Sequence, residues 1–212
     1  HPLRGQNNVQ GASDSGLIPM MYPDYKRVDN AEAQARFEKL WGMKLDPQPG
    51  LTVVEVMNAA IAGKVRGMYV MGENPAMSDP DLNHAREALA SLDWLVVQDI
   101  FLTETAYLAD VVLPASAFPE KTGSFTNTDR MVQLGRRALD MPGDARQDLW
   151  IIQEMARRLG LDWKYAGADS GVAEVFDEMR HAMASIGGIT WERLERESSV
   201  TYPCEPAGDP GQ

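Results

Sequence analysis

The chain has 212 residues, 44% of them hydrophobic and 24% charged, which suits a soluble globular protein with a hydrophobic core. Its net charge of −11 argues against nucleic acid or an anionic membrane as the main partner, because both need a basic surface. The single cysteine, Cys204, excludes an internal disulfide framework and a Cys-rich zinc or iron–sulfur site within these residues.

The first quarter of the chain predicts irregular backbone followed by two helices. Residues 1–25 are rich in Gly, Asn, Gln, Ser and Pro, which indicates either a flexible terminus or a segment whose polar groups need a bound ligand. Apolar residues at helical spacing predict a helix over 30–41. Thr52 and Glu55 form a capping-box pattern, which predicts that a second helix begins there and runs to Gly63.

Strands and helices then alternate. Short β-prone runs predict strands over 65–71, 94–98 and 110–113, with helices over 80–92 and 103–108 between them. This β-α-β-α-β order predicts a parallel sheet flanked by helices, in the Rossmann-like manner.

The remainder predicts a small β-hairpin and a helical appendage. The hairpin is expected over 123–127 and 131–136, around a turn at Thr128-Asp129-Arg130. Three helices are expected after it, over 148–159, 173–184 and 191–195. The Pro/Gly-rich end from Tyr202 onward predicts a linker.

The fold class predicted is therefore α/β, in three consecutive parts. Residues 1–50 are an irregular and helical lead-in from a preceding domain, and residues 51–165 are the Rossmann-like domain. Residues 166–212 are a helical appendage and a linker to a further domain.

Polar residues follow the three predicted strands where ligands bind in an open α/β sheet. Gly72-Glu73-Asn74-Pro75 and Ser78 follow the first strand, Gln98-Asp99 ends the second, and Pro114 ends the third. Glycine lets a backbone approach closely, and amide and carboxylate side chains can read a base or a ribose. The edge therefore suits a nucleotide.

Each feature also has a structural alternative. Gly-Glu-Asn-Pro forms ordinary β-turns, Gln98-Asp99 can be a solvated strand end, and Asp148 can be a helix cap. No Gly-x-Gly-x-x-Gly loop and no Walker motif occurs, so a standard NAD or ATP site is not expected. The three histidines show no ligand spacing.

Several segments carry a resemblance to a known family. They are Arg4–Ala12 (RGQNNVQGA), Gly72–Pro75 (GENP), Val97–Phe101 (VQDIF) with Thr103 and Thr105, Ala109–Pro114 (ADVVLP), Glu120–Arg130 (EKTGSFTNTDR) and Asp148–Trp150 (DLW). In order and spacing, over nearly the whole chain, they resemble molybdenum- or tungsten-dependent formate dehydrogenases, most closely the large subunit of NAD-linked ones.

The resemblance implies a bis(molybdopterin guanine dinucleotide) cofactor with Mo or W, one dinucleotide of which lies across the Rossmann-like domain. The residues it assigns to this cofactor are Gln6, Gly72, Glu73, Asn74, Ser78, Gln98, Asp99, Thr103 and Asp148. Gln98, Asp99 and Thr103 would surround its guanosine end, and Gln6 would lie near the pterin. Ala115 stands where related enzymes have Ser, which leaves open whether Ser116 replaces that hydroxyl.

Arg4 matches the arginine that flanks the metal in this family, so the resemblance implies a catalytic role. A guanidinium stays charged and can hold a carboxylate such as formate by two hydrogen bonds. The family's metal-ligating Cys or selenocysteine and its iron–sulfur cysteines precede this region. The chain is therefore expected to be an internal fragment, inactive and free of cofactor when isolated.

The resemblance implies that the full enzyme oxidises formate to CO2 and passes electrons through iron–sulfur clusters to NAD. Its partners would be iron–sulfur and flavin- or NAD-binding subunits. No run approaches the ~20 apolar residues of a membrane span, so no span is expected. The single cysteine favours a reducing compartment, and a cytoplasmic protein is expected. Two alternatives remain, namely the large iron–sulfur subunit of NADH dehydrogenase, a scaffold without pterin, and another molybdopterin oxidoreductase such as nitrate reductase.

Overall fold

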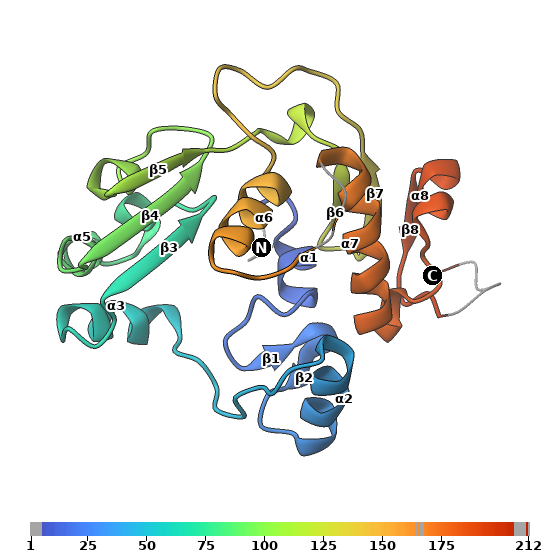
Figure 1. Ribbon diagram of the computed structural model, residues 1–212, viewed down its shortest axis with the longest axis horizontal. Helices are drawn as coiled ribbons and strands as arrows, with labels where there is room; N and C mark the ends of the chain where they lie inside the picture. The colour runs from blue at the N-terminus through green and yellow to red at the C-terminus, as the bar shows by residue number, and fades with distance from the viewer. Residues whose placement is uncertain (1–5, 164, 166–167, 206–210, 212) are drawn as a thin grey trace. The chain divides into compact units, whose positions relative to one another are not determined.

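The computed structural model describes residues 6–163, 165, 168–205 and 211, and it divides into two compact units. The sheet unit contains residues 51–121 and 138–163, and the terminal unit contains residues 1–50, 122–137 and 164–212. Residues 6–50 and 168–205, which are far apart in the sequence, belong to the same unit as the segment 122–137 (Figure 1).

A parallel three-stranded sheet forms the centre of the sheet unit. Strands β3 (Gly67–Met71), β4 (Trp94–Asp99) and β5 (Val111–Pro114) lie in the order β3-β4-β5. The register pairs Met71 with Gln98 and Asp99 with Pro114, so the three carboxyl ends meet at one edge. The predicted α/β class with a parallel sheet is confirmed.

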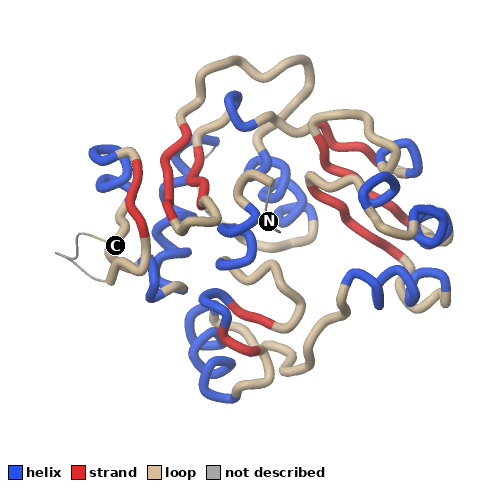
Figure 2. The backbone as a smooth tube through the Cα atoms, turned by 180° about the vertical axis from the view of Figure 1, so that it is seen from behind, coloured by secondary structure: helices blue, strands red, loops and turns tan. Residues whose placement is uncertain are grey.

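Helix α5 packs against this sheet, and α3 packs beside α5 (Figure 2). Helix α3 (Val53–Ile61) begins at the predicted capping box of Thr52 and Glu55, and α5 (Leu82–Ala90) begins at Asp81. Their small residues permit close packing, and Met57, Ala60 and Ala88 are buried between them. Leu89 of α5 packs with buried side chains of β3 and β4, which fixes the helix to the sheet.

Short helical segments connect the strands. A one-turn helix, α4 (Pro75–Ser78), follows β3 and was not predicted, and the expected helix over 103–108 shortens to a 3-10 turn, η2 (Ala106–Leu108). Another 3-10 turn, η3 (Phe118–Glu120), follows β5. Helix α6 (Asp148–Arg158) completes the unit, with Ile151 and Ala156 buried, whereas Leu159, the residue after the helix, is 77% exposed.

An antiparallel sheet and two helices form the larger core of the terminal unit. Strands β6 (Gly123–Thr126) and β7 (Met131–Gly135) form the predicted hairpin, and β8 (Ser199–Thr201) extends it beside β7. Helices α7 (Ala168–Ala182) and α8 (Trp191–Glu197) and the 3-10 turn η4 (Ala184–Ile186) pack against this sheet. The side chains buried there include Val132, Phe176, Ile189, Leu194 and Val200.

The expectation of a linker from Tyr202 onward is wrong for its first residues. Tyr202 is 7% exposed and Cys204 is fully buried in the core of the terminal unit. The N–H of Cys204 donates to Ser185 O and its carbonyl accepts from Gly188 N. A three-residue strand is too short to show periodicity, and the prolines near it hid the packing.

Irregular backbone over 1–25 is also wrong in part. Helix α1 (Val9–Asp14) and the short strands β1 (Met21–Tyr22) and β2 (Lys26–Arg27) occur there, with a 3-10 turn η1 (Pro23–Tyr25) between the strands. Tertiary contacts stabilise α1, since the Tyr202 hydroxyl donates to the buried carboxylate of Asp14. Six residues are too few for a helix to form on propensity alone.

Helix α2 (Ala31–Trp41) matches its prediction and carries a small aromatic cluster. Asn30 caps it by accepting a 2.9 Å hydrogen bond from Ala33 N. Phe37 is fully buried, with its ring centroid 4.8 Å from that of Tyr22 and 4.9 Å from that of Trp41. Across the described residues, we find no helix of the length and apolarity that a membrane crossing requires.

Candidate functional site

The strand-end edge, defined by the residues that follow the carboxyl ends of β3, β4 and β5, carries the predicted nucleotide-binding residues. Gly72 lies directly after β3 with φ at +64°, and its N–H donates to Gln98 O at 2.9 Å. A Cβ added to Gly72 would meet no atom within 4 Å, so open space lies beside this backbone. A left-handed glycine facing open space lets a ligand approach the main chain closely.

Glu73 and Ser78 are joined across the α4 turn. The Ser78 hydroxyl donates to Glu73 Oε1 at 3.0 Å, and the backbone N–H of Asn74 donates to the same oxygen at 3.0 Å. The Gly-Glu-Asn-Pro run is therefore the entry to a helical turn with Asn74 at its N-cap, which replaces the simple β-turn alternative. These two hydrogen bonds hold the Glu73 carboxylate at this edge, where it can interact with a ligand.

Asn74 ties the loop after β3 to the loop after β4. Its Oδ1 accepts from the N–H and the hydroxyl of Thr105, at 3.1 and 2.8 Å, and its Nδ2 donates to Glu104 Oε2 at 2.7 Å. The fully buried Thr105 hydroxyl in turn accepts from Ala76 N at 3.0 Å. Because these bonds occupy both ends of the Asn74 amide, it positions the two loops. The Asn74 amide also lowers the pKa of Glu104.

Asp99 and Thr103 lie in the loop after β4 and organise its backbone. Asp99 Oδ1 accepts from Ile100 N at 2.7 Å and from Phe101 N at 3.2 Å. Thr103 Oγ1 accepts from Ala106 N at 3.2 Å, so it begins the η2 turn. Both side chains keep further acceptor capacity, since a carboxylate and a hydroxyl have several lone pairs.

Gln98 is the buried centre of a chain of side-chain hydrogen bonds. Its Oε1 accepts from the Tyr69 hydroxyl, and its Nε2 donates to Asp148 Oδ1 at 2.7 Å. Asp148 Oδ2 accepts from Lys121 Nζ, which also donates to Ser116 O at 3.0 Å. Burial, with a smaller contribution from Asp148, raises the pKa of Tyr69 and keeps its hydroxyl protonated as a donor.

The residues of this hydrogen-bonded chain differ in exposure, and the difference separates those that can contact a ligand from those that can only position a neighbour. Gln98 is fully buried, whereas the side chains of Lys121 and Asp148 are 22% and 29% exposed. Gln98 can therefore orient Asp148 but has no exposed surface of its own to offer a ligand. Asp148 is the first residue of α6 and Gln147 is its N-cap, so the helix-cap alternative does not describe it.

Ser116 adds a polar group that sequence reasoning left open. Its hydroxyl oxygen is buried and has no hydrogen-bond partner among the described residues, and the residue is 1% exposed. Its carbonyl is held by Lys121, and its N–H donates to Arg146 O at 2.9 Å. A buried hydroxyl without a partner is unusual in proteins. Because Ser116 is about as buried as Gln98, a ligand would reach this hydroxyl only if the backbone beside it moved.

Three further residues of this edge escaped sequence reasoning, namely Tyr69, Thr105 and Lys121. The alternation of side chains along β3 could have identified Tyr69. Residues 69 and 71 lie on the same face of the strand, and Met71 pairs with Gln98, so Tyr69 lies on the Gln98 side of the sheet. Thr105 and Lys121 lie in segments that carry the family resemblance, but no local sequence pattern indicated which residues they contact. Their partners are distant in sequence, and only the fold brings them together.

One predicted site residue, Gln6, does not belong to this edge. It is exposed and lies in the terminal unit, before α1. Arg4 lies outside the described residues. Asn8, two residues after Gln6, accepts at its Oδ1 from Thr126 N at 3.0 Å, which anchors the start of α1 to β6. Among the described residues, no cluster of three or more His, Cys, Asp or Glu side chains could hold a metal ion.

Comparison with known proteins places this geometry in a family. The family model for molybdopterin oxidoreductases matches residues 5–158. The chain belongs to the molybdopterin oxidoreductase family. Its match includes the whole strand-end edge and Asp148, so the predicted family resemblance is confirmed.

Curated relatives within the molybdopterin oxidoreductases carry names of formate dehydrogenases. The F420-dependent formate dehydrogenase subunit alpha of Methanocaldococcus jannaschii is 48% identical over 205 residues, which cover 96% of this chain and 29% of that protein. A putative formate dehydrogenase of Bacillus subtilis is 46% identical over 202 residues, covering 95% of this chain and 20% of that protein. The chain thus spans less than a third of the length of these relatives.

A solved structure shares the fold. Acetylene hydratase from Pelobacter acetylenicus superposes with a TM-score of 0.61 over 91% of this chain and 27% of that one, at 19% sequence identity. At this identity the similarity concerns the fold alone. It agrees with the α/β architecture of the molybdopterin oxidoreductase segment.

Proposed function

We propose that this molybdopterin oxidoreductase segment belongs to a formate dehydrogenase that oxidises formate to carbon dioxide, a proton and two electrons. The observation that carries the proposal is 48% identity, over 96% of this chain, to a relative named formate dehydrogenase. The family model covers the full set of edge residues. A scaffold that had lost its cofactor would have no need of this set.

The strand-end edge fits one guanine dinucleotide of a bis(molybdopterin guanine dinucleotide) cofactor. Gly72 offers a main chain beside open space, which suits the close approach of a phosphate or sugar. The unpartnered hydroxyl of Ser116 is 1% exposed, so it would replace the hydroxyl that Ala115 lacks only after the backbone beside it moves. When bound, the molybdenum or tungsten centre of this cofactor supplies the two-electron redox chemistry.

Some residues of the edge would contact the dinucleotide, and others would position those contacts. Glu73 and Ser78 would contact it beside Gly72, and Asp99, Thr103 and Asp148 would surround its guanosine end. Gln98 and Asn74 would act through others, because hydrogen bonds within the chain occupy both ends of each amide. Lys121 would balance the charge of Asp148 where the dinucleotide brings its own negative charge.

Arg4 and Gln6 would act at the other end of the cofactor. The Arg4 guanidinium would hold the formate carboxylate by two hydrogen bonds and orient its C–H bond toward the reacting centre. Gln6 would lie near the pterin. Both residues precede α1, whose start is anchored to β6 through Asn8.

The electron acceptor has two candidates. The resemblance over the whole chain favours iron–sulfur clusters elsewhere in the full protein and NAD as the final acceptor, through flavin- or NAD-binding partner subunits in the cytoplasm. The names of two similar relatives favour the deazaflavin F420 instead. Reduction of NAD or of F420 by the purified complex with formate distinguishes the two.

Metal and pterin analysis of the full-length protein tests the proposal. Active enzyme is expected to contain molybdenum or tungsten and to release guanine nucleotide on acid hydrolysis. Formate-dependent reduction of a viologen dye should accompany that content. Protein that contains neither metal nor guanine nucleotide yet oxidises formate would overturn the cofactor assignment, and loaded protein without activity would overturn the substrate.

A further inference from the structure

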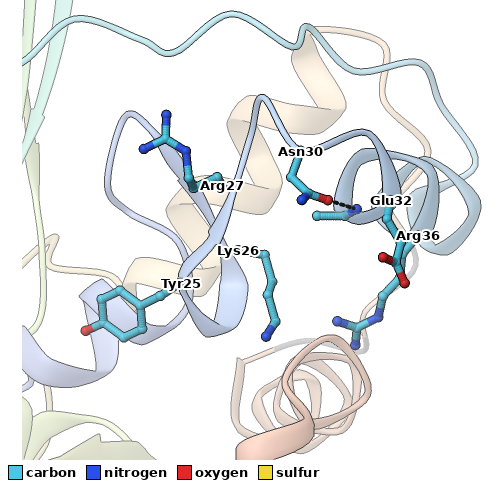
Figure 3. A pocket seen from close by; sticks show the side chains of 7 residues that line it. Tyr25, Lys26, Arg27, Asn30, Glu32 and Arg36 are labelled. Atoms are coloured by element: carbon cyan, nitrogen blue, oxygen red, sulfur yellow. Dashed lines mark hydrogen bonds between the residues drawn. The ribbon is translucent and has the colours of Figure 1, made fainter.

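A cavity of about 380 Å³ lies in the terminal unit, whereas the strand-end edge belongs to the sheet unit. Its volume is within the range of small-molecule sites. The residues that line it come from the η1–β2 turn and the first half of α2 (Figure 3). They are Tyr25, Lys26, Arg27, Asn30, Glu32, Ala33 and Arg36.

The charge of this lining is opposite to that of the chain. Three cations and one carboxylate line the cavity of a chain whose net charge is −11. Arg27 is balanced, because its guanidinium donates to both carboxylate oxygens of Asp29 at 2.8 and 2.6 Å. Lys26, in contrast, has no hydrogen-bond or ion-pair partner within the described residues, so its charge is available to a ligand.

Arg36 supplies a second cation that is already fixed in place. Its Nη2 donates to Ala182 O at 2.9 Å and to His181 O at 3.3 Å, at the end of α7. Its guanidinium also lies 5.1 Å from the centre of the Phe37 ring. These partners carry no formal charge, so they hold the side chain without neutralising it. A cation fixed in advance loses little conformational entropy when an anion binds.

Lys26 and Arg36 extend their charged ends into the same space, and Tyr25 flanks it (Figure 3). The backbone of Asp24 and Tyr25 is left-handed, with φ at 61° and 56°. The Asp24 carboxylate secures this turn by accepting from the N–H of Ser185 at 3.2 Å and from the Ser185 hydroxyl. The turn therefore holds the Tyr25 ring and the Lys26 stem at the rim.

We propose that this cavity binds a small anion whose phosphate or carboxylate group lies between Lys26 and Arg36. Glu32 limits the affinity, because its carboxylate stands on the wall beside Arg36. None of the residues that line the cavity is among those assigned to the redox cofactor or to formate. No residue of the strand-end edge takes part in this site.

Calorimetric titration of the full-length protein with inorganic pyrophosphate and with citrate tests the proposal. Tighter binding of pyrophosphate indicates a phosphate site, and tighter binding of citrate indicates a carboxylate site. Lys26→Gln is expected to weaken binding about tenfold, and Glu32→Gln is expected to strengthen it. Lys39→Gln is the matched control, since it removes one positive charge from the same helix, α2, outside the cavity lining.

Three results would overturn the site. They are the absence of binding by either probe, equal weakening by Lys26→Gln and Lys39→Gln, and no strengthening by Glu32→Gln. Equal weakening would mean that the anion responds only to the overall charge. Thermal unfolding of each variant without probe checks that the fold is intact. Its midpoint is expected to change little, because these side chains make few contacts with the core.

Discussion

Gln98 donates a 2.7 Å hydrogen bond to the carboxylate of Asp148, and this bond joins the end of β4 to the start of α6. The direction of the Gln98 amide is set from its other side, because the Tyr69 hydroxyl donates to Gln98 Oε1. Only one orientation of the amide satisfies both neighbours. The pair therefore fixes where the Asp148 carboxylate points at the strand-end edge.

Gln98→Glu is expected to weaken this edge in a pH-dependent way. It places a second carboxylate against Asp148, and two like charges this close raise the pKa of the pair in the folded protein. The folded state then binds an extra proton. Local stability is expected to be nearly normal at about pH 4, near the ordinary pKa of Glu, and to fall as the pH rises above it.

Gln98→Met is the matched variant, since it keeps the volume and removes the charge. It is expected to cost about 1 kcal/mol without a pH dependence, because water can reach the partly exposed Tyr69 and Asp148. Hydrogen exchange of the β4 amides in the full-length protein measures both effects. Equal protection of β4 in the two variants across the pH range would contradict the repulsion argument.

Gly72→Ala is expected to lower cofactor content more than it lowers stability. Left-handed backbone costs an alanine about 1 kcal/mol. Gly63→Ala is a close control, because Gly63 has φ at +69° against +64° for Gly72 and neither added Cβ would meet an atom within 4 Å. Both variants should lose similar stability, but only Gly72→Ala should purify with less guanine nucleotide per chain. Equal cofactor content in the two variants would show that Gly72 does not contact the cofactor.

Stability in alkaline solution is expected to depend on Tyr202. Burial, with the hydrogen bond to Asp14, raises the pKa of its phenol. The stability this gives is complete below about pH 10, the ordinary tyrosine value, and is lost as the pH rises above it. Tyr202→Phe should therefore lower stability at neutral pH and flatten its decline above about pH 10.

Tyr107→Phe serves as the control for Tyr202, because the Tyr107 side chain is 74% exposed and its hydroxyl is not buried. Its stability profile should follow that of the unsubstituted protein over the whole alkaline range. Hydrogen exchange of the β7 and β8 amides in the full-length protein gives the local readout. An unchanged alkaline decline in Tyr202→Phe would show that other groups cause it.

The parts of the fold that the sequence predicted are those with strong local signals. The capping box at Thr52 and the alternation of strands and helices predicted the three strands and helices α3 and α5 of the sheet unit, because each element shows its own local signal. Helix α1, strand β8 and the buried Cys204 were missed, since long-range contacts stabilise them. The edge followed the same rule: Gln98 and Asp148 were named, but the bond between them spans 50 residues and needed the fold.

Arg4→Lys in the full-length enzyme is expected to lower kcat/KM for formate about 100-fold, a loss typical of removing one well-placed donor to developing charge. Lysine keeps the positive charge but cannot offer two parallel N–H donors to a carboxylate, so orientation fails while attraction remains. Molybdenum or tungsten content should stay unchanged. Arg158→Lys, at a side chain 77% exposed, is the control and should leave turnover unaffected. Unchanged kcat/KM in Arg4→Lys would show that formate is oriented by another group, and the catalytic role of Arg4 would then be wrong.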